Sequence, residues 1–341
     1  MFERIRVGWG LAIACAAAVL WAIDLTVLEP AAEPSKSLPD GLAQNNTYWA
    51  RDLRVMALVA VLGGIVLMVR GERVRSWLGV VGTVLWLGVD VGLDRLDVRG
   101  PTAAFVIAGA ACGALLAAGV LARGRAGRDT DLPVGADRPP GGGLLFAACM
   151  TAAVAPLAAG IESPTDTEAG LTPTAVAAAA LLILAALGCA LAAGPKVSRP
   201  RALAAIAVTA AAGVLVTMAR IASAGTAPRL LAVVVLGVVV LTAVAGLGQA
   251  QPFGGSGLAA FGATTLLLYP VVVLGSSLFM IVSGLPARLL TELAGNSAVN
   301  AADSDLILAF AGIFAGLAFA LVVNGFSRKS WLAEPASMLA R

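Results

Sequence analysis

The segment Leu230–Gly248 reads LLAVVVLGVVVLTAVAGLG and contains no charged residue. A helix needs about 20 predominantly apolar residues to cross the hydrocarbon core of a bilayer, and this run has that length. Inside a membrane the backbone N–H and C=O groups have no water to bond, and a helix satisfies them within one segment. The segment therefore predicts a transmembrane helix.

Nine other segments are also long and predominantly apolar. The 341-residue chain is 59% hydrophobic and only 13% charged, whereas soluble domains carry about 25% charged residues. We predict an all-α, polytopic integral membrane protein that forms a single transmembrane domain without a soluble domain. The predicted spans are residues 8–28, 55–69, 77–93, 102–121, 143–161, 174–193, 202–221, 230–248, 258–282 and 306–326.

The distribution of charge predicts the orientation. Most Lys and Arg residues fall on the side of the N-terminus, including those of the long loop 123–142, which we expect to be flexible, and most acids fall on the other side. Cytoplasmic loops carry the excess of Lys and Arg, so both termini are predicted to be cytoplasmic, in a plasma (inner) membrane. The first apolar run is longer than a signal-peptide core of about 7–15 residues, which favours an uncleaved helix.

Several kinds of chemistry are not expected. The chain has no histidine, which excludes histidine metal sites and Ser-His-Asp catalysis. Its four cysteines lie in separate apolar runs and are interpreted as core residues. We predict no metal and no cofactor. We also predict no nucleic acid, because the net charge is only +3. The excess of Arg over Lys and the abundance of Ala are typical of a GC-rich bacterial, actinobacterial-type composition.

Carboxylates at the outer end of the third span are the sharpest candidates for a function. Asp90, Asp94 and Asp97 are spaced i, i+4, i+7 and share one face if the helix continues beyond its apolar part. Charged groups at membrane depth are costly and often functional, which suggests a cation or proton entry site. The alternative is a set of ion pairs. A hairpin of spans two and three places Arg54 near Asp90 or Asp94. It places Arg51 near Asp94 or Asp97.

Two more charged residues lie in the outer half of the predicted bundle. Asp24 is about one turn from the outer end of the first span, and Arg220 ends the seventh span. Asp24 either reaches the interface or pairs with an arginine such as Arg220. The long stem of Arg220 also allows it to extend its charge to the membrane surface.

The ninth span is the other candidate region. Pro270 removes a backbone hydrogen bond near its middle, and interrupted helices often line cavities in transporters. The hydroxyls that would line such a cavity belong to Thr264, Thr265, Tyr269, Ser276 and Ser277. In the alternative interpretation the helix is only kinked and these hydroxyls bond to their own backbone.

Smaller features concern packing. Residues 287–294 predict a short amphipathic helix on the outer surface, either a lid over a cavity or a connector. The pairs Gly109–Gly113 and Gly312–Gly316 have the GxxxG spacing of close helix contacts.

Two functions are consistent with these features. The first is a transporter or permease subunit for a small or amphipathic solute, with an outward-opening cavity near the ninth span and the Asp24/Asp90 region. The second is a non-catalytic accessory or scaffold subunit that contacts other membrane subunits as well as the lipid bilayer. An intramembrane enzyme that uses Asp90 or Asp94 is a weaker third hypothesis, and an enzyme is the less expected outcome. The sequence leaves the small-molecule ligand open.

Overall fold

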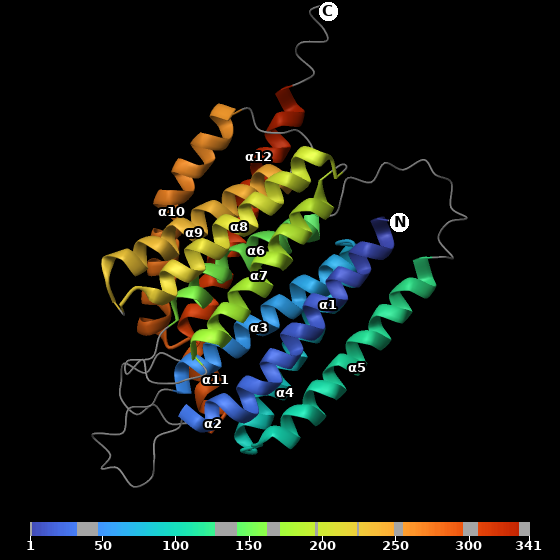
Figure 1. Ribbon diagram of the computed structural model, residues 1–341, viewed down its shortest axis with the longest axis vertical. Helices are drawn as coiled ribbons and strands as arrows, with labels where there is room; N and C mark the ends of the chain where they lie inside the picture. Colours follow the sequence, from blue (N-terminus) through green and yellow to red (C-terminus); the bar gives the residue numbers. More distant parts are fainter. Residues whose placement is uncertain are drawn as a thin grey trace, which may run out of the picture.

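A computed structural model describes residues 2–32, 47–126, 142–161, 171–194, 197–223, 225–248, 255–295 and 306–333. These residues form helices and contain no strand. The long helices run roughly parallel or antiparallel to one another in one bundle, and the short helices α2 and α11 lie together at one end of it (Figure 1). Most of the predicted loop 123–142 and parts of the outer loops lie outside the described residues.

The helices are, in chain order, α1 (Phe2–Ile23), a π-helical turn (Asp24–Leu28), α2 (Glu29–Ala32), α3 (Thr47–Met68), α4 (Arg73–Arg95), α5 (Pro101–Ala126), α6 (Gly142–Gly160), α7 (Leu171–Ala193), α8 (Arg199–Ile221), α9 (Ala227–Gly248), α10 (Gly255–Ser283), α11 (Ala287–Leu293) and α12 (Ile307–Ala333).

Nine helices among the described residues are long and apolar enough to cross a membrane. They correspond to nine of the predicted spans, which supports a multi-pass membrane protein. The remaining predicted span, 55–69, lies in α3, which begins at Thr47 and carries Arg51, Asp52 and Arg54 in its first turns. These three charges set α3 apart from the others. Ten crossings and cytoplasmic termini remain predictions.

The centre of the bundle consists of α6 with α3 and α7. Helix α6 is buried along nearly its whole length, and an apolar helix buried on all sides belongs to an interior. Helices α4, α5, α8 and α10 lie at the rim and expose large apolar side chains, such as Phe105, Leu203 and Leu267. In a membrane these side chains would contact lipid, which explains why they need no partner within the chain.

The boundaries of two predicted spans change in the structure. The first does not continue as one α-helix to residue 28, because the π-helical turn replaces its last part. The ninth is not interrupted at Pro270, because α10 continues as one helix from Gly255 to Ser283. Pro270 therefore does not produce the unwound segment that a broken transporter helix has.

The packing of α5 on α1 can be tested through two native thiols. The Sγ of Cys112 in α5 lies 3.7 Å from the carbonyl oxygen of Cys15 in α1, and the two thiols are close enough to interact. Copper phenanthroline is therefore expected to join Cys15 to Cys112. A protease site inserted within residues 33–46 allows the disulfide bond to be detected. After cleavage the two fragments should stay linked until reductant is added.

The variant Cys15→Ser is the control and should give separate fragments with or without oxidant. The buried pair Cys149 and Cys189 should play no part. If the oxidised native chain also separates after cleavage, α5 does not pack against α1 as described.

Candidate functional site

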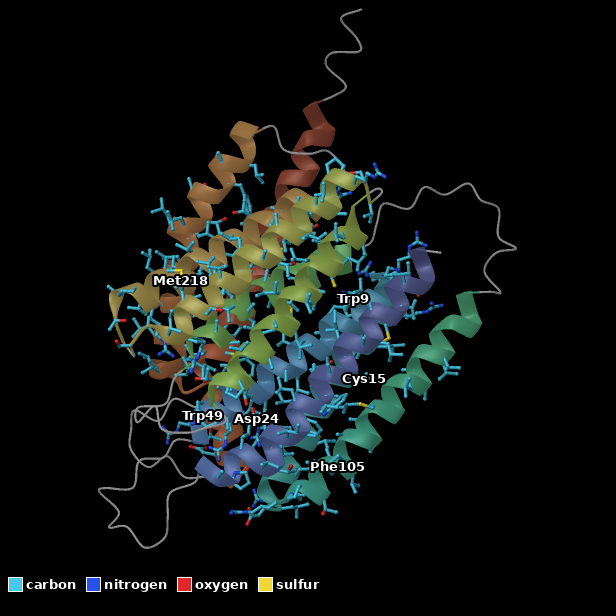
Figure 2. The ribbon with its side chains drawn as sticks, viewed as in Figure 1. Trp9, Cys15, Asp24, Trp49, Phe105 and Met218 are labelled. Carbon is cyan, nitrogen blue, oxygen red and sulfur yellow. The ribbon has the colours of Figure 1, made fainter. Side chains whose placement is uncertain are left out.

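Charged side chains of four neighbouring segments meet inside the bundle at the end where α2 and α11 lie. We call them the charge cluster: Asp24 of the π-helical turn, Glu29 of α2, Arg51 and Arg54 of α3, and Asp90 and Asp94 of α4. Figure 2 places Asp24 toward this end of α1, with Trp9 toward the opposite end. All members except Asp94 are 3% exposed or less, so the cluster is an interior feature of the helical bundle.

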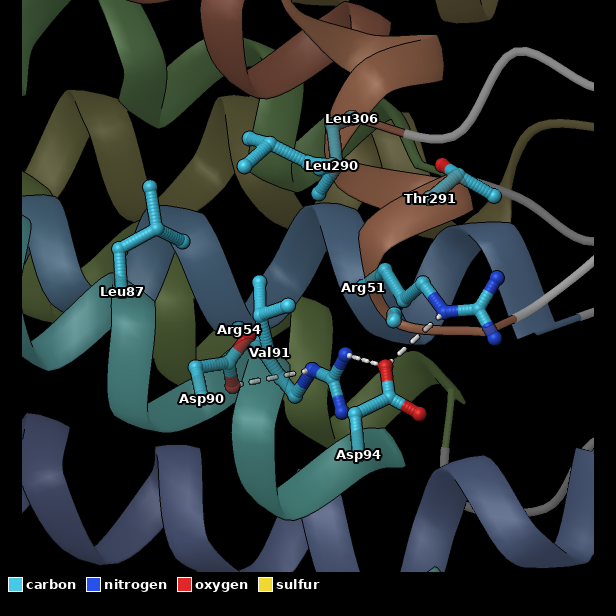
Figure 3. Close-up of a pocket in the computed structure, with 10 residues that line it drawn as sticks. Arg51, Arg54, Leu87, Asp90, Val91, Asp94, Leu290, Thr291 and Leu306 are labelled. Atoms are coloured by element: carbon cyan, nitrogen blue, oxygen red, sulfur yellow. Dashed lines mark hydrogen bonds and ion pairs between the residues drawn. The ribbon is translucent and has the colours of Figure 1, made fainter. Parts of the chain in front are cut away.

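Arg54 joins the acids of two helices. Its Nη2 donates to Asp94 Oδ2 at 2.7 Å, and its Nε lies 3.4 Å from Asp90 Oδ1. Its Nη1 donates to Glu29. Figure 3 shows the guanidinium between Asp90 and Asp94. Arg54 thus ties α4 and α2 to α3, using the planar fork that suits arginine to carboxylate pairing.

A second arginine and a tryptophan complete these contacts. The Nε of Arg51 lies 2.8 Å from Glu29 Oε1 and 3.4 Å from Asp94 Oδ2. Trp21 donates its indole N–H to Asp90 Oδ1 at 2.7 Å. The ring of Trp21 meets that of Trp86 edge to face, with centroids 5.3 Å apart. Asp90 is therefore held by α1 and α3 at once.

Asp24 differs from the other acids of the cluster. It is 1% exposed, and neither of its carboxylate oxygens has a hydrogen-bond partner within the described chain. Arg54, Glu29 and Asp90 are close enough to act on it electrostatically. If every group is ionised, the cluster contains four carboxylates and two guanidiniums. An ion-pair set that served only to hold helices together would not require this excess of negative charge.

A small cavity adjoins the cluster. Its volume is about 10 Å³, and its wall includes Asp90 and Asp94 on one side and Leu290 and Thr291 of α11 on the other. A cavity of about 10–15 Å³ accommodates one water molecule. Figure 3 shows α11 beside the two arginines. The short amphipathic helix expected at 287–294 therefore exists as α11 and forms one wall of this cavity.

The predicted acidic ladder is correct for two of its three members. Arg54 pairs with Asp90 and Asp94, and Arg51 with Asp94, as the hairpin of spans two and three predicts. Asp97 does not join them. Helix α4 ends at Arg95, and Asp97 follows in a turn with φ of 55°, where it pairs with Arg99. The helix ends before the third position of the ladder.

The suggested pairing of Asp24 with Arg220 is wrong. Arg220 donates to the carbonyl oxygen of Ile161 and, at 2.9 Å, to the hydroxyl of Thr172. Arg229 donates to the same Ile161 carbonyl at 3.1 Å. Two arginines thus meet at the C-terminal end of α6, where unpaired carbonyls and the helix dipole favour positive charge. Arg220 belongs to this helix cap and not to the charge cluster.

The α10 candidates lie apart from the cluster, and the hydroxyls of Thr265, Tyr269 and Ser276 bond to backbone carbonyls. Thr265 donates to Phe261 O at 2.8 Å and Ser276 to Val272 O at 2.7 Å, each one turn back on the same helix. Tyr269 is 1% exposed and donates across the bundle to Ala153 O at 2.8 Å. Pro270 and Ser277 are half-buried. The bonds of Thr265 and Ser276 match the alternative in which the hydroxyls bond to their own helix, whereas Tyr269 bonds to α6 instead. None of the three hydroxyls has a proton left to donate.

Glu29 and Trp21 are members of the site that sequence reasoning did not single out. Glu29 follows Asp24 by five residues, a spacing that places them on different faces of an α-helix. The π-helical turn, in which the N–H of Glu29 bonds to Asp24 O, brings them to one side. Asp52 was missed as well, and it accepts the N–H of Ala309 in the first turn of α12 at 2.7 Å. A charged run at the start of α3 was the signal that could have found it.

Comparisons with protein-family models, curated proteins and solved structures find no match to this chain.

Proposed function

We propose that this multi-pass membrane protein is a transporter or permease subunit for a small or amphipathic solute, and that the charge cluster is its working site. The observation that carries the proposal is the placement of six ionisable side chains inside a bundle of membrane-type helices, beside a cavity walled by a short surface helix. Ionisable groups within membrane helices are costly and mark solute or ion pathways.

The charge balance supports a site that exchanges a ligand. Replacing a buried ion pair by apolar side chains is often neutral or stabilising, so stability alone gives little reason to keep six such groups. Within the part of the chain that the structure describes, the cluster also keeps Asp24 without a hydrogen-bond partner. The carboxylate of Asp24 would stabilise a cation or proton that reaches the cluster.

The working site is proposed at the cluster and not at the middle of α10. Tyr269 packs so closely on Gly237 that a Cβ there would lie 2.6 Å from its ring. The hydroxyls of Thr265 and Ser276 are bonded to their own helix. Opening a cavity beside Pro270 would require breaking this packing, whereas the cluster already adjoins a cavity.

Thiol labelling tests the proposal. Val91 of α4 lines the cavity and is half-buried, so an impermeant maleimide, which is larger than one water, should modify it slowly while the site is closed and faster when the site opens. We expect Val91→Cys to be labelled in intact cells, and one solute from a panel of amino acids, sugars and organic amines to slow the labelling.

Two further variants give the labelling rates with which that of Val91→Cys is compared. Leu289→Cys, on the exposed side of α11, gives the rate for an open position, and Tyr269→Cys gives the rate for a packed one. The native protein gives the background from its own four cysteines. Labelling of Val91→Cys as slow as that of Tyr269→Cys, with every solute, contradicts a site that opens.

An accessory or scaffold subunit is the second candidate function. It is favoured by the internal bonding of the α10 hydroxyls and by two glycines of α5, Gly109 and Gly113. Among the described residues outside the local backbone of α5, no atom lies within 4 Å of the position that a Cβ would occupy on either glycine. Small residues let helices of different chains approach closely in a membrane. A lack of maleimide labelling at Val91→Cys would favour this second function.

A further inference from the structure

Asp24 lies at an irregular turn of the first helix. Residues Asp24–Leu28 form a π-helical turn, in which the N–H of Glu29 bonds five residues back to Asp24 O. Such turns frequently interrupt α-helices at functional sites. Thr26 donates its hydroxyl to Ala22 O at 2.8 Å, and Gly100 donates its N–H to Thr26 O at 2.8 Å. The irregular backbone is thus supported by its neighbours, whereas no hydrogen bond from the described residues reaches the side chain of Asp24.

We infer that Asp24 binds and releases a proton, and that this proton is the coupling ion of the charge cluster. The transfer moves one proton from hydronium to a carboxylate oxygen and leaves a neutral acid and a water molecule. The role of this proton as a coupling ion rests on the proposed function, whereas proton binding by Asp24 is measurable without any solute.

Burial and the lack of hydrogen bonds are the first argument. A carboxylate removed from water needs hydrogen bonds or a counter-ion, and without them its burial is costly. Asp24 is 1% exposed and neither oxygen accepts a hydrogen bond within the described chain. Binding a proton removes the charge and with it most of this cost.

The neighbouring charges are the second argument. Arg54 of α3 attracts the Asp24 carboxylate, whereas Glu29 of α2 and Asp90 of α4 repel it. Helix α5 also packs against the turn. Gly100, the residue before α5, donates its N–H to Thr26 O and not to Asp24. Arg54 already forms ion pairs with three other acids, Glu29, Asp90 and Asp94. One proton on Asp24 lowers the excess of negative charge in the cluster from two to one.

The size of the space decides between a proton and a larger cation. The adjoining cavity has a volume of about 10 Å³, enough for one water molecule, so an organic cation does not fit without rearrangement. Among the described residues, no three acidic or thiol side chains converge as metal ligands. A proton needs neither volume nor a ligand set, so a cavity of this size does not exclude it.

Infrared difference spectroscopy on the purified full chain in lipid tests this inference. A protonated carboxyl group has a carbonyl stretch separate from that of a carboxylate, and the stretch shifts in heavy water if the proton exchanges. We expect a protonated-acid band that disappears as pH is raised, and that is lost in Asp24→Asn. The variant Asp90→Asn should keep the band, although its position will change with the altered neighbour.

Stability gives a second readout. Asparagine closely matches a neutral aspartic acid in size. When the native protein is measured at a pH below that at which the band is half lost, Asp24→Asn should therefore unfold at the same temperature. A band absent at every pH, unaffected by Asp24→Asn, or present unchanged at every pH overturns the inference. These results leave the labelling of Val91→Cys unaffected, so a failure of proton binding is distinguishable from a failure of the proposed transport function.

Discussion

Replacing Arg54 with methionine is expected to destabilise the folded protein by about 3–5 kcal/mol, because removing one partner of a buried ion pair leaves uncompensated charge behind. Arg54 is 2% exposed and contacts Glu29, Asp90 and Asp94. Methionine fills a similar volume but supplies no positive charge and no donor. The measurement is the free energy of unfolding in mixed lipid–detergent micelles, followed by tryptophan fluorescence during denaturing-detergent titration.

Two variants separate charge from geometry in this test. Arg54→Lys keeps the charge but loses the fork that reaches Glu29 and Asp94 together, so an intermediate loss is expected. Arg288→Met breaks an exposed i,i+4 pair with Glu292 and should cost less than about 1 kcal/mol. If Arg54→Met unfolds like Arg288→Met, Arg54 does not hold the acids of a buried cluster.

Gly316→Ala is expected to destabilise the protein by about 1–3 kcal/mol, the usual cost of inserting a methyl group into a well-packed interior. A Cβ at this position of α12 would lie 2.5 Å from the Cα of Met150 and 3.0 Å from the carbonyl oxygen of Cys149 in α6. Both are backbone atoms, so no side-chain rotation relieves the contact and the two helices must separate. The same unfolding titration measures the loss.

Gly113→Ala is the matched control, since Gly113 belongs to the other GxxxG pair. In the part of the chain that the structure describes, no atom outside the local backbone of α5 lies within 4 Å of a Cβ placed there. Alanine favours helix over glycine by about 1 kcal/mol, so this variant should be as stable as the native protein or slightly more so. Equal losses at Gly113 and Gly316 would contradict the packing of α12 on α6.

The apolar runs were sufficient to predict the helices, because length and apolarity are local properties of the chain. The pairing of Arg54 with Asp90 and Asp94 was also predictable, since a hairpin between consecutive helices fixes which of their ends are neighbours. Identical spacing did not distinguish Gly109–Gly113 from Gly312–Gly316. Only the packing of helices distant in sequence decides which pair is in contact.

Three features depended on tertiary structure that no local pattern contained. The π-helical turn that brings Glu29 to the same side as Asp24 has no sequence signature of its own. Trp21 reaches Asp90 only because α1 packs beside α4 at that level. The close approach of α1 to α3, where a Cβ on Gly10 would lie 2.6 Å from Gly64 O, involves single glycines and no GxxxG pair.

The rate at which an impermeant maleimide modifies Val91→Cys in intact cells is the decisive measurement, because the proposed function requires an ionisable site that opens to solvent. We expect labelling faster than at Tyr269→Cys and slowed by one of the solutes offered. Labelling no faster than at Tyr269→Cys, whatever the solute, would mean that the charge cluster stays closed, and would contradict a transport site at the junction of α1, α3 and α4.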